Sequence, residues 1–95
     1  MATGYVGILS VELHFPESGS LKGKRKHVKS AKAQLRERFG ASVAEVDHQE
    51  LWQRAALGVA VVALSESSAR NALHAARREA ESDPRAEVIA FEVLV

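Results

Sequence analysis

The residues best able to do chemistry lie together in the stretch SVAEVDHQELWQR, residues 42–54. The stretch begins with the alternation of a half-buried strand and ends in polar side chains around Trp52. His48 is the one catalytic candidate, because an imidazole exchanges protons near neutral pH and Asp47 or Glu45 could fix its tautomer. No nucleophile can be placed beside it from the sequence, so a structural or binding role at a hairpin tip is favoured over catalysis.

The spacing of the histidines does not predict a metal site. None of them forms an H-x3-H or comparable pair; they are His14, His27, His48 and His74. The sequence contains no cysteine, which excludes thiolate metal sites and disulfides and fits a reducing compartment. We therefore expect neither a metal nor a cofactor.

A basic segment is the second feature with chemical meaning. The segment from Leu21 to Arg38 contains one acidic residue, Glu37. It contains eight basic residues: Lys22, Lys24, Arg25, Lys26, Lys29, Lys32, Arg36 and Arg38. The net charge of the whole chain is only +1, so the remainder is acidic. Such a segment attracts anions through its local field. The alternative is a helix face that is simply solvated.

The hydrophobic periodicity predicts the elements that position these groups. Ser20 is a good N-cap and Gly40 a good C-terminal stop for the first helix. The expected elements are a strand at 5–15, a helix at 21–39, strands at 41–47 and 55–64, a helix from Ser65 or Ser67 to Ser82, and a strand at 86–95. This β-α-β-β-α-β order predicts one α+β domain over residues 1–95, with a ferredoxin-like fold. It has a four-stranded antiparallel sheet with both helices on one face.

Alternation along the outer strands predicts which side chains face the helices. For the first strand these are Tyr5, Leu9, Val11, Leu13 and Phe15, and for the last Ile89, Phe91, Val93 and Val95. The opposite face then carries the apolar Val6, Ile8, Val88 and Leu94. A wide exposed apolar face is unusual in a monomer, so we expect a homo-oligomer through it. The alternative is a monomer whose face is partly covered by the hairpin tip and Trp52.

The topology also brings His14, the loop PESGS, the start of the first helix and the hairpin to one edge of the sheet. A helix N-terminus favours anions. The expected anion- or RNA-binding residues are Ser20, Lys22, Lys24, Arg25, Lys26, Lys29, His48, Gln49, Gln53 and Arg54. We expect Trp52 to pack over the end of its own core as a structural pin, although a lone Trp can also stack on a nucleobase.

The motifs SLKGKR at 20–25 and FGASVAEVDHQELWQRAALGVAVV at 39–62 resemble the bacterial domain-of-unknown-function 503 proteins, also called YlxP-like. The resemblance covers nearly the whole chain and implies a ferredoxin-like fold. In many bacteria the genes of this family lie near those for translation initiation and ribosome maturation factors, which implies RNA or ribosome association. The resemblance implies no established activity.

One departure from the family pattern is Gly23, where the family usually has Glu. A Glu three residues after the Ser20 N-cap would complete a capping box. Gly23 removes this and lowers local helix stability by roughly 1 kcal/mol. We expect a frayed first turn unless an anion or a partner orders it.

The sequence as a whole favours a non-enzymatic RNA- or ribosome-associated module that uses the basic helix and the His48–Arg54 hairpin edge. A small-molecule anion-binding or acid/base enzyme site at the same edge, possible at an oligomer seam, is the first alternative. A structural assembly module acting through the apolar sheet face is the second. No run is apolar enough to cross a membrane and no signal peptide is apparent, so we expect a cytoplasmic protein.

Overall fold

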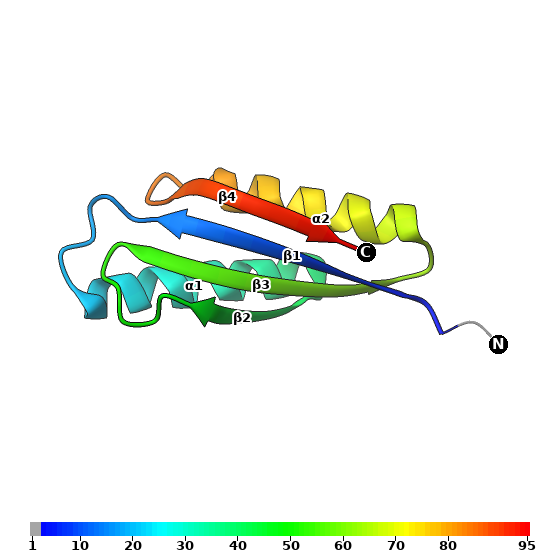
Figure 1. The fold of residues 1–95 in the computed structure, drawn as a ribbon, viewed down its shortest axis with the longest axis horizontal. Coiled ribbons are helices and arrows are strands. Elements are labelled where there is room, and N and C mark those ends of the chain that lie inside the picture. Colours follow the sequence, from blue (N-terminus) through cyan, green and yellow to red (C-terminus); the bar gives the residue numbers. More distant parts are fainter. Residues whose placement is uncertain (1–2) are drawn as a thin grey trace.

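A computed structural model describes residues 3–95 and has the predicted ferredoxin-like α+β fold (Figure 1). Its elements are β1 (Tyr5–His14), α1 (Leu21–Phe39), β2 (Ser42–Asp47), β3 (Arg54–Ala63), α2 (Glu66–Glu81) and β4 (Glu87–Leu94). Within residues 3–95, no helix is long and apolar enough to cross a membrane.

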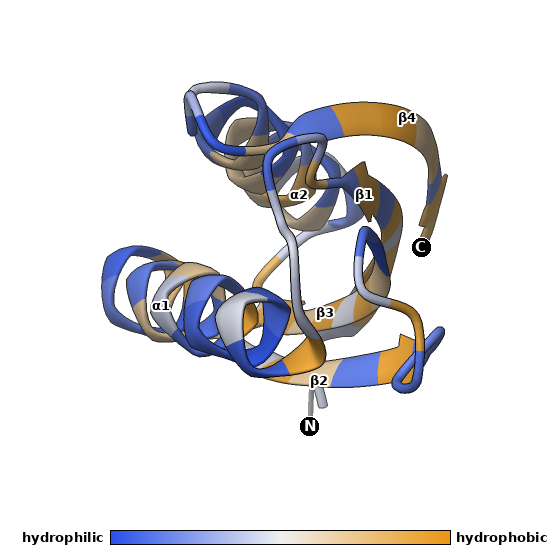
Figure 2. Cartoon of the chain, turned by 90° about the vertical axis from the view of Figure 1, so that its left-hand side faces the viewer, coloured by the Kyte–Doolittle hydropathy of each residue, from blue (hydrophilic) through white to orange (hydrophobic). Residues whose placement is uncertain are grey.

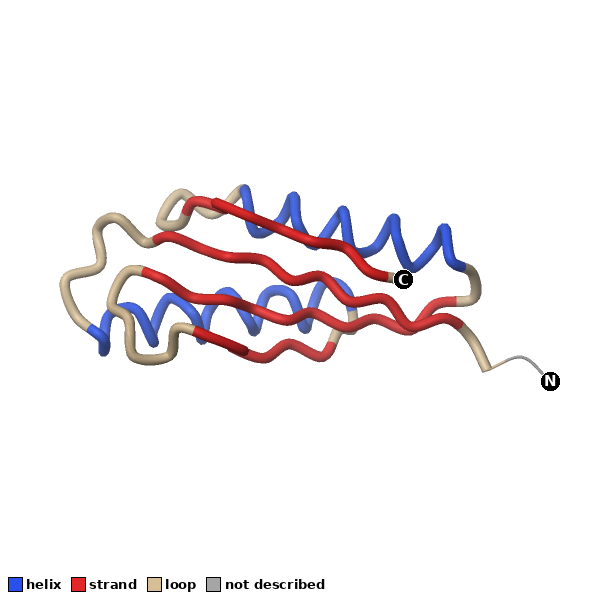
Figure 3. Tube along the Cα trace, viewed as in Figure 1, coloured by secondary structure: helices blue, strands red, loops and turns tan. Residues whose placement is uncertain are grey.

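The four strands form one antiparallel sheet in the order β2-β3-β1-β4, so β1 and β3 are central. Both helices lie on one side of the sheet, with α1 beside β2 and β3 and α2 beside β1 and β4 (Figures 2 and 3). The β1–β3 register runs from Tyr5 opposite Ala63 to His14 opposite Arg54. The end of β1 therefore lies beside the start of β3, next to the β2–β3 hairpin.

The core lies between the sheet and the two helices. The fully buried side chains come from alternate strand positions and from the inner helix faces, and they include Leu9, Val11, Leu13, Leu57, Val59, Leu35 and Leu73. The contact of α2 with β1 is close, because a Cβ at Gly7 would lie 2.7 Å from Leu73 Cδ1. Burial of this apolar surface is the main stabilising contribution to the fold.

The predicted caps define the ends of α1. The Ser20 side chain accepts a hydrogen bond of 3.0 Å from the backbone N–H of Gly23, and Gly40 has the left-handed φ of 57° that favours glycine at this position. The helix is regular from Leu21 onward. The predicted fraying of its first turn concerns its stability and remains a prediction.

One prediction about side-chain direction, that for β4, was wrong. Tyr5 shares the face of Gly7 and Leu9 as predicted but is half exposed, because β1 extends at this end beyond the cover of the helices. In β4, Val88 packs against the core while Ile89 is exposed. The cause is a register irregularity between Glu12 and Leu13 that shifts the pairing of β4 by one residue. Such a bulge moves the following side chains to the opposite face of the sheet.

Candidate functional site

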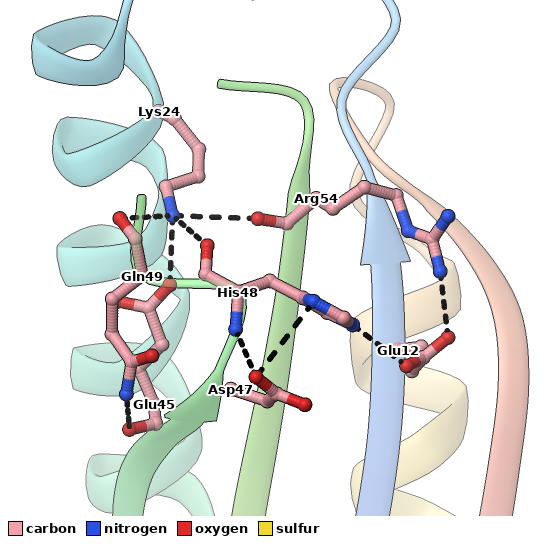
Figure 4. A network of polar contacts seen from close by, with 7 residues as sticks. All are labelled: Glu12, Lys24, Glu45, Asp47, His48, Gln49 and Arg54. Carbon is pink, nitrogen blue, oxygen red and sulfur yellow. Dashed lines mark hydrogen bonds and ion pairs between the residues drawn. The ribbon is translucent and has the colours of Figure 1, made fainter. Parts of the chain in front are cut away.

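Lys24 connects α1 to the β2–β3 hairpin. Its side chain is fully buried, and four oxygens surround its ammonium (Figure 4). It donates to Glu45 Oε2 at 2.9 Å and to the backbone carbonyls of His48 at 2.9 Å, Gln49 at 3.2 Å and Arg54 at 3.3 Å. The buried charge is therefore compensated by a carboxylate and by carbonyl dipoles.

The prediction that Lys24 binds a phosphate was therefore wrong. The ammonium has three protons, and protein oxygens accept all of them. The sequence contained a signal for this outcome, because Lys24 lies four residues before the buried Val28 and so shares its face of the helix.

The hairpin tip is built around His48. Its backbone has a positive φ of 64°, a left-handed conformation that is uncommon for a residue with a side chain. The backbone N–H donates to Asp47 Oδ1 at 2.7 Å, and the carbonyl accepts from Leu51 N at 3.0 Å as well as from Lys24. This turn directs the imidazole toward β1 (Figure 4).

The His48 ring meets a carboxylate that the sequence did not indicate. Its Nε2 lies 3.0 Å from Glu12 Oε1, while its Nδ1 lies 3.9 Å from Asp47 Oδ1. The expectation that Glu45 orients the ring was wrong, because Glu45 is paired with Lys24. Asp47 accepts from the backbone N–H of His48 and lies beyond hydrogen-bond distance of the ring, so Glu12 takes the role expected of it. When the imidazole is neutral and Nε2 donates to Glu12, Nδ1 is the nitrogen that can accept a proton.

Glu12 joins His48 to Arg54. Arg54 Nη2 donates to Glu12 Oε2 at 2.9 Å, so each oxygen of the carboxylate has one partner. The hydrogen bond from His48 and then the guanidinium of Arg54 hold the pKa of Glu12 below its ordinary value. Because His48 and Arg54 both contact this carboxylate, an anion bound here would have to compete with Glu12.

The two predicted glutamines contact loop backbone. Gln49 Nε2 donates to the carbonyl of Glu45 at 3.4 Å. Gln53 Nε2 donates to the carbonyls of Pro16 at 3.3 Å and Ser18 at 3.2 Å, and so joins the hairpin to the loop before α1. Both side chains therefore bind the backbone of this edge. The sequence had predicted that they bind a ligand there.

Trp52 does not act as a structural pin, and that prediction was wrong. Its side chain is 57% exposed. The end of the core is closed by Phe15, which is buried and stacks on His27 with the ring centroids 5.9 Å apart. Phe15 also donates its backbone N–H to the carbonyl of Gln53 at 2.9 Å. The hairpin loop is thus held by this backbone bond and by the side chains of Lys24 and Gln53, and the indole is exposed to solvent.

The basic residues at the start of α1 have a different environment from Lys24. Four of them are exposed and line one shallow hollow together with Ser20 and Gly23: Lys22, Arg25, Lys26 and Lys29. None of the four forms an ion pair with another residue of the described range 3–95. The structure therefore brings together these four predicted residues as a cationic surface, which we call the α1 cation stripe.

No group of three or more His, Asp or Glu side chains able to hold a metal ion occurs within residues 3–95. The chemistry of this edge is thus that of the Glu12–His48–Arg54 cluster, the Lys24 contacts and the α1 cation stripe.

A comparison with known proteins assigns this chain to a family. The family described as "Protein of unknown function (DUF503)" matches residues 6–93. A Bacillus subtilis (strain 168) protein named "Uncharacterized protein YlxP" is 33% identical over 60 residues, which cover 63% of this chain and 65% of that protein. The aligned part therefore spans less than two thirds of that relative's own length.

Proposed function

Because the chain belongs to the DUF503 family, whose description assigns no function, we propose a function from the chain's own geometry: it binds the phosphate backbone of RNA, free or within the ribosome, through the α1 cation stripe. The observation that carries this proposal is the set of four exposed cations without an ion-pair partner among residues 3–95.

The spacing of these cations suits a backbone contact. Residues 22 and 26, and likewise 25 and 29, are four positions apart, and residues 22 and 25, and 26 and 29, are three apart, so the four side chains share one side of the helix. The other basic residues of α1 include two that have partners within the fold. Arg36 donates to the carbonyl of Val43 at 2.7 Å, and Arg38 forms an ion pair with Glu79. The stripe is therefore the exposed cluster of the basic segment that is available to a ligand, while Lys32 is partly buried and lies outside it.

Trp52 supports a single-stranded ligand. Lys24 ties the hairpin loop to the first turns of α1, so the exposed indole belongs to a loop that is anchored beside the stripe. Proteins that bind single strands combine a cationic surface with aromatic rings on which bases stack. Contacts with phosphates and stacking on one ring give little discrimination between sequences, so we propose weak sequence selectivity.

The test is the affinity for a labelled single-stranded RNA, measured by fluorescence anisotropy. The double variant Lys22→Gln/Lys26→Gln removes two cations of the stripe, and Arg70→Gln/Arg78→Gln removes two exposed cations of α2. The first variant is expected to bind at least about 100-fold more weakly, since each of the two lost hydrogen bonds to a charged group contributes about 1.5 kcal/mol or more. The proposal fails if both variants lose affinity equally or if the wild type does not bind.

A small-ligand acid/base site at His48 is the second candidate, and the observation favouring it is the Glu12–His48 contact of 3.0 Å. A carboxylate that fixes the tautomer of an imidazole is a recurring arrangement in acid/base catalysis, and strained backbone is frequent at functional sites. NMR titration with small carboxylates and phosphates separates the candidates. Shifts confined to Glu12 and His48 favour this site, whereas shifts along the α1 cation stripe favour the proposed function.

A further inference from the structure

The sheet face turned away from the helices carries exposed apolar side chains. Figure 2 shows both helices on the other side of the sheet. Because Gly7 and Leu9 point toward the helices, Val6 and Ile8 point the other way, and Val62 lies opposite Val6 on β3. The large exposed apolar side chains of this face are Val6, Ile8, Val46, Val62 and Leu94. Val62 alone is 73% exposed. Removing such an apolar surface from water against a partner lowers the free energy.

The face combines a ridge with a hollow. Ile8 lies beside Leu94 of β4 in the sheet register, and these branched side chains form the ridge. Next to Ile8 is a shallow hollow of about 270 Å³ whose floor and sides are small residues of β2 and β3: Ser42, Ala44, Gly58 and Ala60. Val46 borders the small residues, because a Cβ at Gly58 would lie 3.2 Å from Val46 Cγ1.

The ridge and the hollow lie side by side on one chain, which is the arrangement that a twofold contact needs. In an isologous dimer, residue i of one copy contacts residue j of the other, and residue j contacts residue i in return. We propose that a second copy of this chain covers this face, with Ile8 of each copy seated in the hollow of its partner.

The distribution of charge favours a second copy. The hollow and the ridge are formed by uncharged residues. At the hairpin end of the same face, the carboxylate of Glu12 already pairs with Arg54 and His48. Glu92 of β4, beside Ser10 in the sheet register, is an exposed carboxylate of this face that lies outside the ridge and the hollow. The α1 cation stripe lies on the other side of the sheet, and the net charge of the chain is +1. Two copies would therefore meet without strong repulsion at the ridge and the hollow.

The available area is sufficient for a weak dimer. The four strands of 10, 6, 10 and 8 residues present a face of about 540 Å², given spacings of about 4.8 Å between strands and 3.3 Å between residues. Two such faces bury about 1,100 Å² in total, just below the standard size of specific interfaces and in the range of weak ones. We expect a dissociation constant in the micromolar range. The inference is independent of RNA binding, because the two surfaces lie on opposite layers.

Sedimentation velocity from about 1 µM to about 1 mM spans the expected range. The wild type is expected to shift from monomer to dimer, while Ile8→Glu stays monomeric at every concentration. Ser42→Arg, which places a charge in the hollow from an exposed position, should also stay monomeric. Ala33→Glu, at an exposed position of α1, is the matched control and should dimerise like the wild type.

Circular dichroism of each variant verifies that the fold is retained. A wild type that is monomeric throughout would overturn the proposal and leave the face to a different partner. Undiminished dimerisation of both Ile8→Glu and Ser42→Arg would overturn it as well, because the contact would then lie elsewhere.

Discussion

The ammonium of Lys24 lies 2.9 Å from the backbone carbonyl oxygen of His48, and this contact fixes the hairpin to the first turns of α1. Lys22 and Lys24 are two positions apart and chemically identical, yet one is exposed and the other is fully buried. The basic segment therefore contains two kinds of cation, one that holds the fold together and one that is free for a ligand.

Replacing Lys24 should destabilise the protein strongly. Lys24→Met leaves Glu45, which is mostly buried, without its cation and leaves three carbonyls with one donor fewer. Removing one member of a buried ion pair costs about 3–5 kcal/mol. Lys22→Met is the matched control at an exposed position and should change the free energy of unfolding by less than about 0.5 kcal/mol. Urea unfolding of both variants measures the difference, and equal effects would contradict the structural role of Lys24.

The left-handed backbone at His48 predicts an unusual order of stabilities. His48→Ala and His48→Gly both remove the contact with Glu12, but only glycine adopts a φ of 64° without steric cost. His48→Gly should therefore be more stable than His48→Ala by about 1 kcal/mol. Thermal unfolding of the two variants tests this. If the alanine variant proved the more stable, the hairpin tip would not have this conformation.

The pKa of Glu12 predicts how acid acts on the hairpin edge. His48 and then Arg54 lower this pKa from its ordinary value of 4.5. A carboxylate whose pKa is lower in the folded state stabilises the fold above its unfolded pKa, and that contribution is lost as the pH falls through the folded pKa. Wild type should thus exceed Glu12→Gln in stability at neutral pH, and the gap should close as the pH falls below 4.5.

Unfolding by urea at several pH values measures this gap. Glu92→Gln, on an adjacent strand at the position paired with Ser10, is the control, because Glu92 forms no ion pair within residues 3–95. A gap between wild type and Glu12→Gln that stays constant from about pH 7 to pH 3 would show that the Glu12 charge does not stabilise the fold.

The exposure of Trp52 predicts a small cost of removing it. Trp52→Ala should lower the free energy of unfolding by less than about 1 kcal/mol, whereas truncating a buried Trp costs about 3–5 kcal/mol. Leu35→Ala, in the core, should cost about 2–5 kcal/mol and calibrates the experiment. A loss of comparable size for Trp52→Ala would place the indole in the core. If stacking contributes to RNA binding, Trp52→Ala should also weaken that binding.

The fold was predictable because its signals are local. The alternation in β1, the Ser20 cap and the Gly40 stop each define an element without reference to the rest of the chain. The β4 bulge was not predictable in this way, because the shift at Val88 and Ile89 arises from pairing with β1. Alternation along one strand carries no information about the register of its neighbour.

The candidate site was predictable only in part, because part of it also depends on pairing between strands. Helical spacing predicts the exposed cations of α1. The same spacing could have predicted the burial of Lys24, which lies one turn before the buried Val28. The Glu12–His48–Arg54 cluster joins residues 36 and 42 positions apart in the chain. It forms because β1 pairs with β3 and because the hairpin tip turns through a left-handed residue. Neither condition is apparent in the residues of the cluster alone.

The dependence of RNA affinity on salt tests the central claim most directly. For single strands, the slope of log K against log salt concentration is about −0.7 for each phosphate neutralised. If all four cations of the α1 stripe contact phosphates, the slope should be about −3 for the wild type and about −1.5 for Lys22→Gln/Lys26→Gln. The control Arg70→Gln/Arg78→Gln should keep the wild-type slope. A wild-type slope near zero, or an equal slope in the stripe variant, would contradict RNA binding by the α1 cation stripe.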